Sequence, residues 1–198
     1  MTQPRLVLAT SNAGKVVELT AMLENTFIVE ARPDGLAETV EDAETLELNA
    51  IKKASEVAVF SRQTSLADDS GLFVDALGGE PGVLTARYAG RQCSPGDNID
   101  KMLREMQDVE RPDRTATFRT VIAVVSAEGE TVLAEGSVAG QIATQRRGTA
   151  GFGYDPIFVP EEGPGLTFAE MMPEAKRQLS HRARALEAIL DKLSPASF

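Results

Sequence analysis

The sequence predicts a mixed α/β fold in which one sheet carries both parallel and antiparallel strand pairs. Short apolar runs alternate with segments of helical apolar spacing, a pattern typical of α/β proteins. Two β-rich runs, residues 115–126 and 131–144, enclose Glu128-Gly129 and predict an antiparallel hairpin with a short turn. The chain has 198 residues, of which 42% are hydrophobic and 25% charged. We therefore expect a single domain over residues 1–198.

The N-terminal part should begin with a strand at residues 5–10, followed at once by a helix. Apolar residues at steps of three and four predict that helix over residues 14–24. A second strand is expected at residues 27–31 and a second helix at residues 45–60. Asn49 and Lys53 lie one turn apart on that second helix, where they could meet a ligand together or form a solvated face.

Turn-forming residues divide the rest of the chain. We expect strands at residues 64–67, 72–77 and near 154–159, a loop at residues 78–90, and helices at residues 97–106 and 173–193. If the last helix were continuous, Lys176 and His181 would point about 140° apart and could not serve one ligand. We therefore predict a break near Ser180, with Ser180 as N-cap and with His181 and Arg182 at the positive end of the final helix.

Charge and composition exclude several classes of function. A net charge of −10 disfavours binding to duplex nucleic acid, whose affinity comes from many contacts between cations and phosphates. One cysteine and one histidine argue against a disulfide and against a zinc site. No apolar run is long enough for a signal peptide or a membrane span. We expect a cytoplasmic protein with no membrane partner.

The clearest candidate site is the loop at residues 10–15, Thr10-Ser11-Asn12-Ala13-Gly14-Lys15. It lies between a strand and a helix, where free N–H groups and the helix dipole favour bound phosphate. The spacing of a Walker P-loop is absent, and Val16 follows Lys15 where Ser or Thr would hold magnesium. The alternative is an ordinary capped helix.

Two adjacent carboxylates, Asp68 and Asp69, precede Ser70-Gly71 at a predicted sharp turn. Adjacent strand residues face opposite ways, so one carboxylate should enter a site while the other braces the turn. Carboxylate oxygens suit Mg²⁺, and a carboxylate can also accept a proton from water.

The segment Gly148 to Asp155 carries glycines on both sides of Phe152. It lacks the spacing of a dinucleotide-binding loop. The glycines would let the backbone approach a ligand and leave the Phe152 ring exposed for stacking on a base. A tight bend into a strand is the alternative.

Five motifs, in order, resemble those of the inosine triphosphate pyrophosphatase family. They are T-S-N-A-G-K, A-D-D-S-G-L, G-G-E-P-G-V with A-R-Y-A-G, G-F-G-Y-D-P-I-F and S-H-R, and they span nearly the whole chain. The resemblance implies an elongated α/β fold with two lobes around a substrate cleft. It also implies a Mg²⁺-dependent homodimer that hydrolyses ITP, dITP and XTP to the monophosphate and pyrophosphate.

The resemblance also implies roles for individual residues. Asp69 would be the proton acceptor for a water that attacks the α-phosphorus, Lys15 would stabilise the departing charge, and Asp69 and Glu41 would bind the metal. Substrate-binding positions would be Thr10, Ser11, Asn12, Ala13, Gly14, Lys15, Lys53, Ser70, Arg87, Phe152, Gly153, Tyr154, Asp155, Lys176, His181 and Arg182. Donors from His181 and Arg182 would accept the oxygen at purine C6, but the feature that rejects the 2-amino group of GTP is not located.

Three alternative functions stay open, and one departure from the family pattern favours the second of them. Leu48 stands where many relatives carry an acidic residue before the Asn-Ala pair, and Leu48 cannot bind a metal. One alternative is a Maf-like pyrophosphatase for canonical or pyrimidine triphosphates. A second is a catalytically silent nucleotide-binding module, and a third is a structural or interaction protein.

Overall fold

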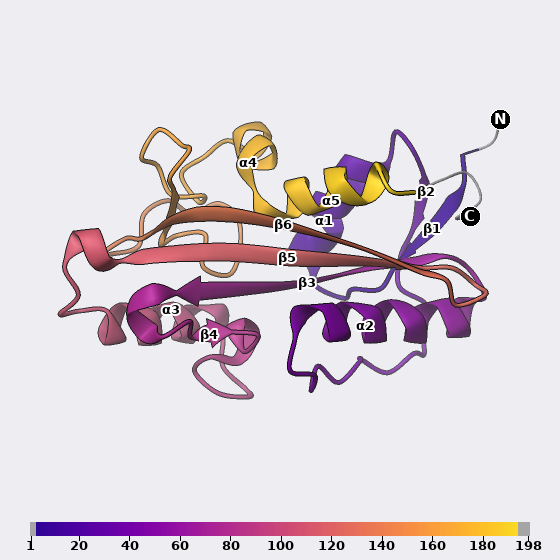
Figure 1. The fold of residues 1–198 in the computed structure, drawn as a ribbon, viewed down its shortest axis with the longest axis horizontal. Coiled ribbons are helices and arrows are strands. Elements are labelled where there is room, and N and C mark those ends of the chain that lie inside the picture. The colour runs from indigo at the N-terminus through magenta and orange to yellow at the C-terminus, as the bar shows by residue number, and fades with distance from the viewer. Residues whose placement is uncertain (1–2, 194–198) are drawn as a thin grey trace. The chain divides into compact units, whose positions relative to one another are not determined.

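The computed structural model describes residues 3–193 and confirms a mixed α/β fold (Figure 1). The strands are β1 (Arg5–Leu8), β2 (Ile28–Glu30), β3 (Ser65–Val74), β4 (Pro81–Gly82), β5 (Thr115–Val125), β6 (Thr131–Ile142) and β7 (Phe158–Pro160). The helices are α1 (Ala13–Leu23), α2 (Leu46–Ser61), α3 (Pro95–Glu105), α4 (Pro173–Leu179) and α5 (His181–Leu190). No helix in this part of the chain has the length and apolar character of a membrane span.

The strands form one seven-stranded sheet, ordered β2-β1-β3-β5-β6-β7, with β4 paired to β3. Pairing is parallel where β1 meets β2 and β3, and antiparallel between β3 and β4 and between β6 and β7. The predicted mixture of parallel and antiparallel pairs is therefore confirmed.

The chain forms two compact units, each assembled from separate segments. The first unit holds the described residues up to Asp69, the segment Thr120–Gly136 and the described residues from Ala185 onward. The second unit holds Ser70–Arg119 and Ser137–Arg184. Strands β3, β5 and β6 and helix α5 each contribute residues to both units.

The core of the first unit lies where α1 and the C-terminal part of α5 pack on the strands. Leu19 and Leu23 of α1 join Leu186 and Ile189 of α5 in one buried cluster. Strand residues of that cluster are Leu6, Leu8, Leu66, Ile122 and Val124. Helix α2 covers the opposite face of these strands (Figure 1).

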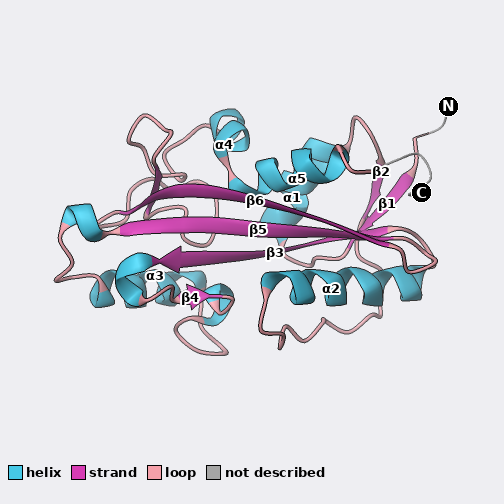
Figure 2. Ribbon diagram, in the orientation of Figure 1, coloured by secondary structure: helices cyan, strands magenta, loops and turns pink. Residues whose placement is uncertain are grey.

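The core of the second unit is rich in aromatic side chains. It gathers Phe118 of β5, Phe158 of β7 and Phe168 from the loop that follows β7. Met102 of α3 also belongs to it. Figure 2 shows that β7 is the only regular element between β6 and α4, so this core orders a long, mostly irregular segment.

The predicted break in the last helix is confirmed. Ser180 is extended, with φ −72° and ψ 148°, and separates α4 from α5. Its Oγ accepts a hydrogen bond of 3.2 Å from the Ala183 N–H, so it is the N-cap of α5. His181 is the first residue of α5.

The predicted sharp turn at Asp68-Asp69-Ser70-Gly71 is wrong, because β3 runs without interruption through all four residues. Aspartates favour turns, but Asp68 and Asp69 are tolerated in this buried strand because each carboxylate forms an ion pair with a lysine. At Gly71 a β-carbon would lie 2.8 Å from the Gly82 carbonyl oxygen, so the close approach of β4 accounts for the glycine. The strand predicted to reach residue 77 ends at Val74, and Asp75–Leu77 forms a 3₁₀-helix.

Candidate functional site

The loop at residues 10–15 forms a capped turn at the N-terminus of α1. The Asn12 side-chain oxygen accepts a hydrogen bond of 3.2 Å from the Lys15 N–H. The Asn12 N–H donates to the Thr10 hydroxyl at 3.2 Å, and the Ser11 hydroxyl donates to Glu38 at 2.6 Å. The loop thus lies at the positive end of an 11-residue helix, and phosphate binding there stays a prediction.

Lys15 reaches from this loop to β3. Its Nζ lies 3.0 Å from Oδ2 of Asp68 and 3.4 Å from the Asp68 carbonyl oxygen. The Asp68 side chain is fully buried, whereas that of Lys15 is 15% exposed. Asp68 therefore binds a lysine instead of bracing a turn, contrary to the prediction.

The second charged cluster of the first unit centres on Lys53. Its Nζ donates to Oδ1 of Asp69 at 2.7 Å, to the Asp68 carbonyl at 2.7 Å and to Oε1 of Glu41 at 3.0 Å. Asn49 lies one turn earlier, and its side-chain oxygen accepts from the Ala43 N–H at 3.1 Å. Both side chains lie on the buried face of α2, so the solvated-face alternative is wrong.

Burial and charge act in opposite directions in this cluster. Burial alone would lower the pKa of the Lys53 ammonium, but the carboxylates of Asp69, Asp68 and Glu41 outweigh it and raise that pKa above 10.5. Burial raises the pKa of the Asp69 carboxyl above 3.8, against the opposing charges of Lys53 and Lys15. A buried carboxylate with a raised pKa is a better proton acceptor than an exposed one.

The predicted metal ligands Glu41 and Asp69 both lie within 3.0 Å of the Lys53 Nζ. Their oxygens are the hard donors that Mg²⁺ prefers, and Mg²⁺ is commonly held by one or two carboxylates together with phosphate oxygens and water. No group of three or more His, Cys, Asp or Glu side chains suited to a metal occurs in residues 3–193. Leu48, at the position where many relatives carry an acidic residue, is 53% exposed and offers no ligand atom. Glu41 and Asp69 supply two such donors, and a Mg²⁺ site at these residues stays a prediction.

The second unit gathers a separate set of predicted residues around Phe152. Oδ2 of Asp155 accepts hydrogen bonds of 2.7 Å from both the Lys176 Nζ and the Phe152 N–H. The Lys176 Nζ lies 4.9 Å from the centre of the Phe152 ring, and the Arg182 guanidinium carbon lies 5.4 Å from it. Both cations therefore lie within cation–π distance of the half-buried ring.

The S-H-R motif lies in the same unit and is buried. Arg182 is 2% exposed, and its Nη2 lies 3.3 Å from the Ser70 hydroxyl. The His181 ring packs against Phe118 and Phe168. The structure therefore brings Ser70, Phe152, Asp155, Lys176, His181 and Arg182 into one unit, while Lys15, Glu41, Lys53 and Asp69 belong to the other.

Arg87 and Tyr154 are joined through the backbone of the second unit. Arg87 ends the 3₁₀-helix Thr85–Arg87, and the buried Tyr154 hydroxyl donates to the Thr85 carbonyl at 3.0 Å. The Asn98 amide holds the other side of this segment. It donates to the Ala86 carbonyl at 3.1 Å and accepts from the Ala89 N–H at 2.7 Å.

Gly151 should prove essential to the Asp155–Lys176 pair. Its φ is +76°, and an added β-carbon would lie 2.0 Å from Oδ2 of Asp155. We expect Gly151→Ala to displace that carboxylate and lower the free energy of unfolding by about 2–3 kcal/mol, measured by urea denaturation.

Gly153→Ala is the matched control for that substitution. Gly153 has a φ of +58°, but no atom lies within 4 Å of its added β-carbon. We expect a loss of about 1 kcal/mol from backbone strain alone. Equal losses in the two variants would show that the Asp155 contact is unimportant.

Sequence reasoning missed two side chains that contact predicted site residues or the segment that carries them, Asn98 and Phe118. Asn98 lies on the predicted helix α3 and bears no motif, so its bonds to the Arg87 segment have no local signal. Phe118 is an apolar residue inside a predicted strand, and its contact with His181 joins residues far apart in the chain.

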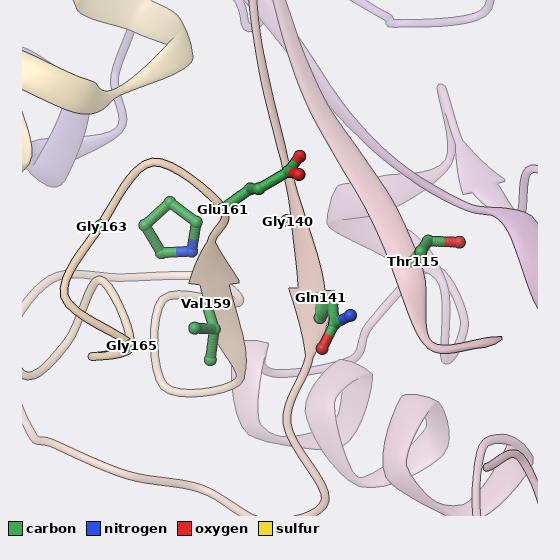
Figure 3. Close-up of a pocket in the computed structure, with 8 residues that line it drawn as sticks. Thr115, Gly140, Gln141, Val159, Glu161, Gly163 and Gly165 are labelled. Carbon is green, nitrogen blue, oxygen red and sulfur yellow. The ribbon is translucent and has the colours of Figure 1, made fainter. Parts of the chain in front are cut away.

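A cavity of about 280 Å³ in the second unit lies apart from these residues. Figure 3 shows Gln141 of β6, Val159 of β7 and Glu161 around it. Its other lining residues are Thr115, Gly140, Pro160, Gly163 and Gly165. None of the predicted site residues lines it.

The chain is similar to known proteins in both sequence and structure. The model of the Ham1 family matches residues 6–192. A dITP/XTP pyrophosphatase of Shouchella clausii is 45% identical over 191 residues, which cover 95% of this chain and 96% of the relative. One from Caulobacter vibrioides is 47% identical over 182 residues, covering 91% and 93%. The structure of a HAM1 protein from Coxiella burnetii has a TM-score of 0.85 at 34% identity and covers 96% of this chain and 100% of that one.

Proposed function

The chain belongs to the Ham1 family, and from that premise we propose that it hydrolyses the non-canonical purine triphosphates ITP, dITP and XTP to the monophosphate and pyrophosphate. The names of the relatives support this substrate class, since several that match over more than 90% of both chains are dITP/XTP pyrophosphatases. The observation that carries the chemistry is the Lys53 ammonium bound by both Asp69 and Glu41.

Asp69 accepts the proton of the attacking water in this proposal. The water oxygen forms a bond to the α-phosphorus, the bond from that phosphorus to the bridging oxygen breaks, and pyrophosphate leaves. The buried carboxylate, whose pKa is raised, suits this role, and the hydrogen bond from Lys53 fixes its orientation. Lys53 thus acts on the reaction by positioning Asp69.

Lys15 and the N-terminus of α1 bind the triphosphate. The ammonium group and the helix dipole both offer positive charge to the phosphate oxygens that gain charge as pyrophosphate departs. The Lys15 ammonium has three N–H donors, and its side chain is partly exposed, so it can keep its bond to Asp68 and offer another N–H to phosphate.

Mg²⁺ is the proposed cofactor, with Glu41 and Asp69 as its protein ligands. It would supply positive charge at the phosphates and lower the pKa of water. Without it, the acidic surface of a protein of net charge −10 would repel a triphosphate. We also propose a cytoplasmic homodimer, on the resemblance of its motifs to the inosine triphosphate pyrophosphatase family.

Residues of the second unit bind the purine base of the substrate. Phe152 stacks on the purine, and His181 and Arg182 donate to the oxygen that hypoxanthine and xanthine carry at C6. Adenine presents an amine donor there, so the same donors repel it. The partial exposure of the Phe152 ring supports this role, because it leaves part of the ring for a base to contact, and the donors of Arg182 lie close to the same ring.

A substrate panel with product analysis tests the proposal. The protein is incubated with ITP, XTP, GTP, ATP and dTTP plus Mg²⁺, and pyrophosphate and orthophosphate are measured separately. We expect pyrophosphate from ITP and XTP at rates far above those for ATP and dTTP. Orthophosphate as the first product would refute attack at the α-phosphorus, and a preference for dTTP would favour the Maf-like alternative.

A further inference from the structure

The His181 ring lies face to face on the ring of Phe118. The two ring centres are 4.5 Å apart, and the planes differ by 8°. Both side chains are buried, with 4% of His181 and 6% of Phe118 exposed. Both belong to the second unit. This contact joins the first residue of α5 to the middle of β5.

Phe118 is itself held in a fixed orientation. Its ring meets Phe158 edge to face, with ring centres 4.7 Å apart and planes at 65°. Phe168 packs beside it at 6.4 Å, tilted by 30°. Phe158 and Phe168 also contact each other at 5.2 Å. Contacts with Phe158, Phe168 and His181 together restrain the Phe118 ring, so the loss of Phe158 alone leaves two of them in place.

A fixed ring plane determines where the donors of His181 point. The hydrogens and lone pairs of an imidazole all lie in the plane of its ring. The N-cap at Ser180 places the backbone of His181, and the stack on Phe118 sets the remaining rotation of the ring. A hydrogen-bond acceptor can therefore bind a His181 N–H only in the plane of the imidazole ring, which is nearly parallel to the Phe118 ring.

We propose that Phe118 is a positioning residue that determines purine selectivity by holding the His181 donors toward the oxygen at C6. The inference rests on the proposed function, since it requires that His181 reads the base. Without the stack, the imidazole plane would turn, and the donors would discriminate less sharply between an acceptor oxygen and an amine.

Phe118→Leu tests the proposal, because leucine keeps an apolar side chain in the core but removes the flat face. The matched control is Phe158→Leu, which removes a ring from the same cluster but not the one that stacks on His181. Phe118→Met, with an unbranched and adaptable side chain, replaces the leucine variant if that variant does not fold.

Proton NMR reports the stack directly, because His181 is the only histidine in the chain. In protein without a histidine tag, its ring protons should be shifted upfield by the Phe118 ring current. We expect Phe118→Leu to abolish that shift and Phe158→Leu to retain most of it. Equal loss in both variants would show that the stack depends on the cluster as a whole and would overturn the role assigned to Phe118.

The kinetic test compares kcat/KM for ITP with kcat/KM for ATP. We expect the ratio to fall about tenfold in Phe118→Leu, as for the loss of one well-aligned hydrogen bond, and to change less than about twofold in Phe158→Leu. An unchanged ratio in a Phe118→Leu protein that has lost the NMR shift overturns this inference alone. Failure of the wild-type protein to prefer ITP overturns the proposed function as well.

Discussion

Asp69→Asn should lower kcat for ITP about a thousandfold and leave the protein folded. The amide has nearly the size of the carboxylate, and its oxygen can still accept the hydrogen bond that Lys53 donates at 2.7 Å. It cannot accept a proton from water at neutral pH. The measurement is pyrophosphate release under saturating ITP and Mg²⁺, with circular dichroism to verify folding.

Asp42→Asn is the control for the loss of one negative charge. Asp42 follows Glu41 directly in the chain, is exposed, and binds Lys52 at 2.7 Å instead of Lys53. We expect kcat to stay within about twofold of the wild-type value, because exposed ion pairs contribute little. Activity of Asp69→Asn within tenfold of wild type would remove Asp69 from the role of proton acceptor.

Arg114→Leu should cause the largest loss of stability, about 3–5 kcal/mol in the free energy of unfolding. Arg114 is 3% exposed, and its guanidinium donates to the carbonyls of Ile142 at 2.8 Å, Ala143 at 3.0 Å, Val109 at 3.2 Å and also Met106. Met106 is the C-cap of α3, where a cation is favoured by the helix dipole. Burial lowers the pKa of this guanidinium below its usual value, but arginine stays charged.

Leucine at this position would remove the hydrogen bonds that the guanidinium donates to four carbonyl oxygens, two of them buried, which is why the expected loss is large. Thermal unfolding should begin about 10 °C lower than in the wild-type protein. Arg111→Leu is the control, because Arg111 is exposed and lies only three residues away. A loss below 1 kcal/mol in Arg114→Leu would show that water replaces the guanidinium.

The sequence predicted elements well where local spacing and local electrostatics agree. The strand before residues 10–15 follows from an apolar run and the helix after them from an amphipathic repeat, and both occur in the structure. The break at Ser180 was predicted from the directions that Lys176 and His181 would take on one helix, and it is confirmed.

The failure at β3 has a physical cause that local sequence does not contain. Asp68-Asp69-Ser70-Gly71 has the composition of a turn, yet it lies in a buried strand because Lys15 and Lys53 neutralise the two carboxylates. Those lysines come from α1 and α2, at least 15 residues away in the chain. Ion pairs that form only in the folded protein therefore outweigh the local turn propensity of these residues.

In the candidate site, too, local sequence signals were predictive and tertiary contacts were not. Its residue types were visible as motifs, and the family resemblance assigned their roles. Their partners were not visible, since Glu41 and Asp69 share Lys53, and Phe118 supports His181, only through tertiary contacts.

The division of the chain into interleaved segments has a consequence for how the protein must be synthesised and folded. The backbone passes from one unit to the other between Asp69 and Ser70, Arg119 and Thr120, Gly136 and Ser137, and Arg184 and Ala185. Neither unit corresponds to a contiguous stretch of the gene, so neither can be excised as a fragment or exchanged as a cassette. The first unit cannot be completed until the described residues from Ala185 onward have left the ribosome, so its folding depends on contacts of high sequence separation.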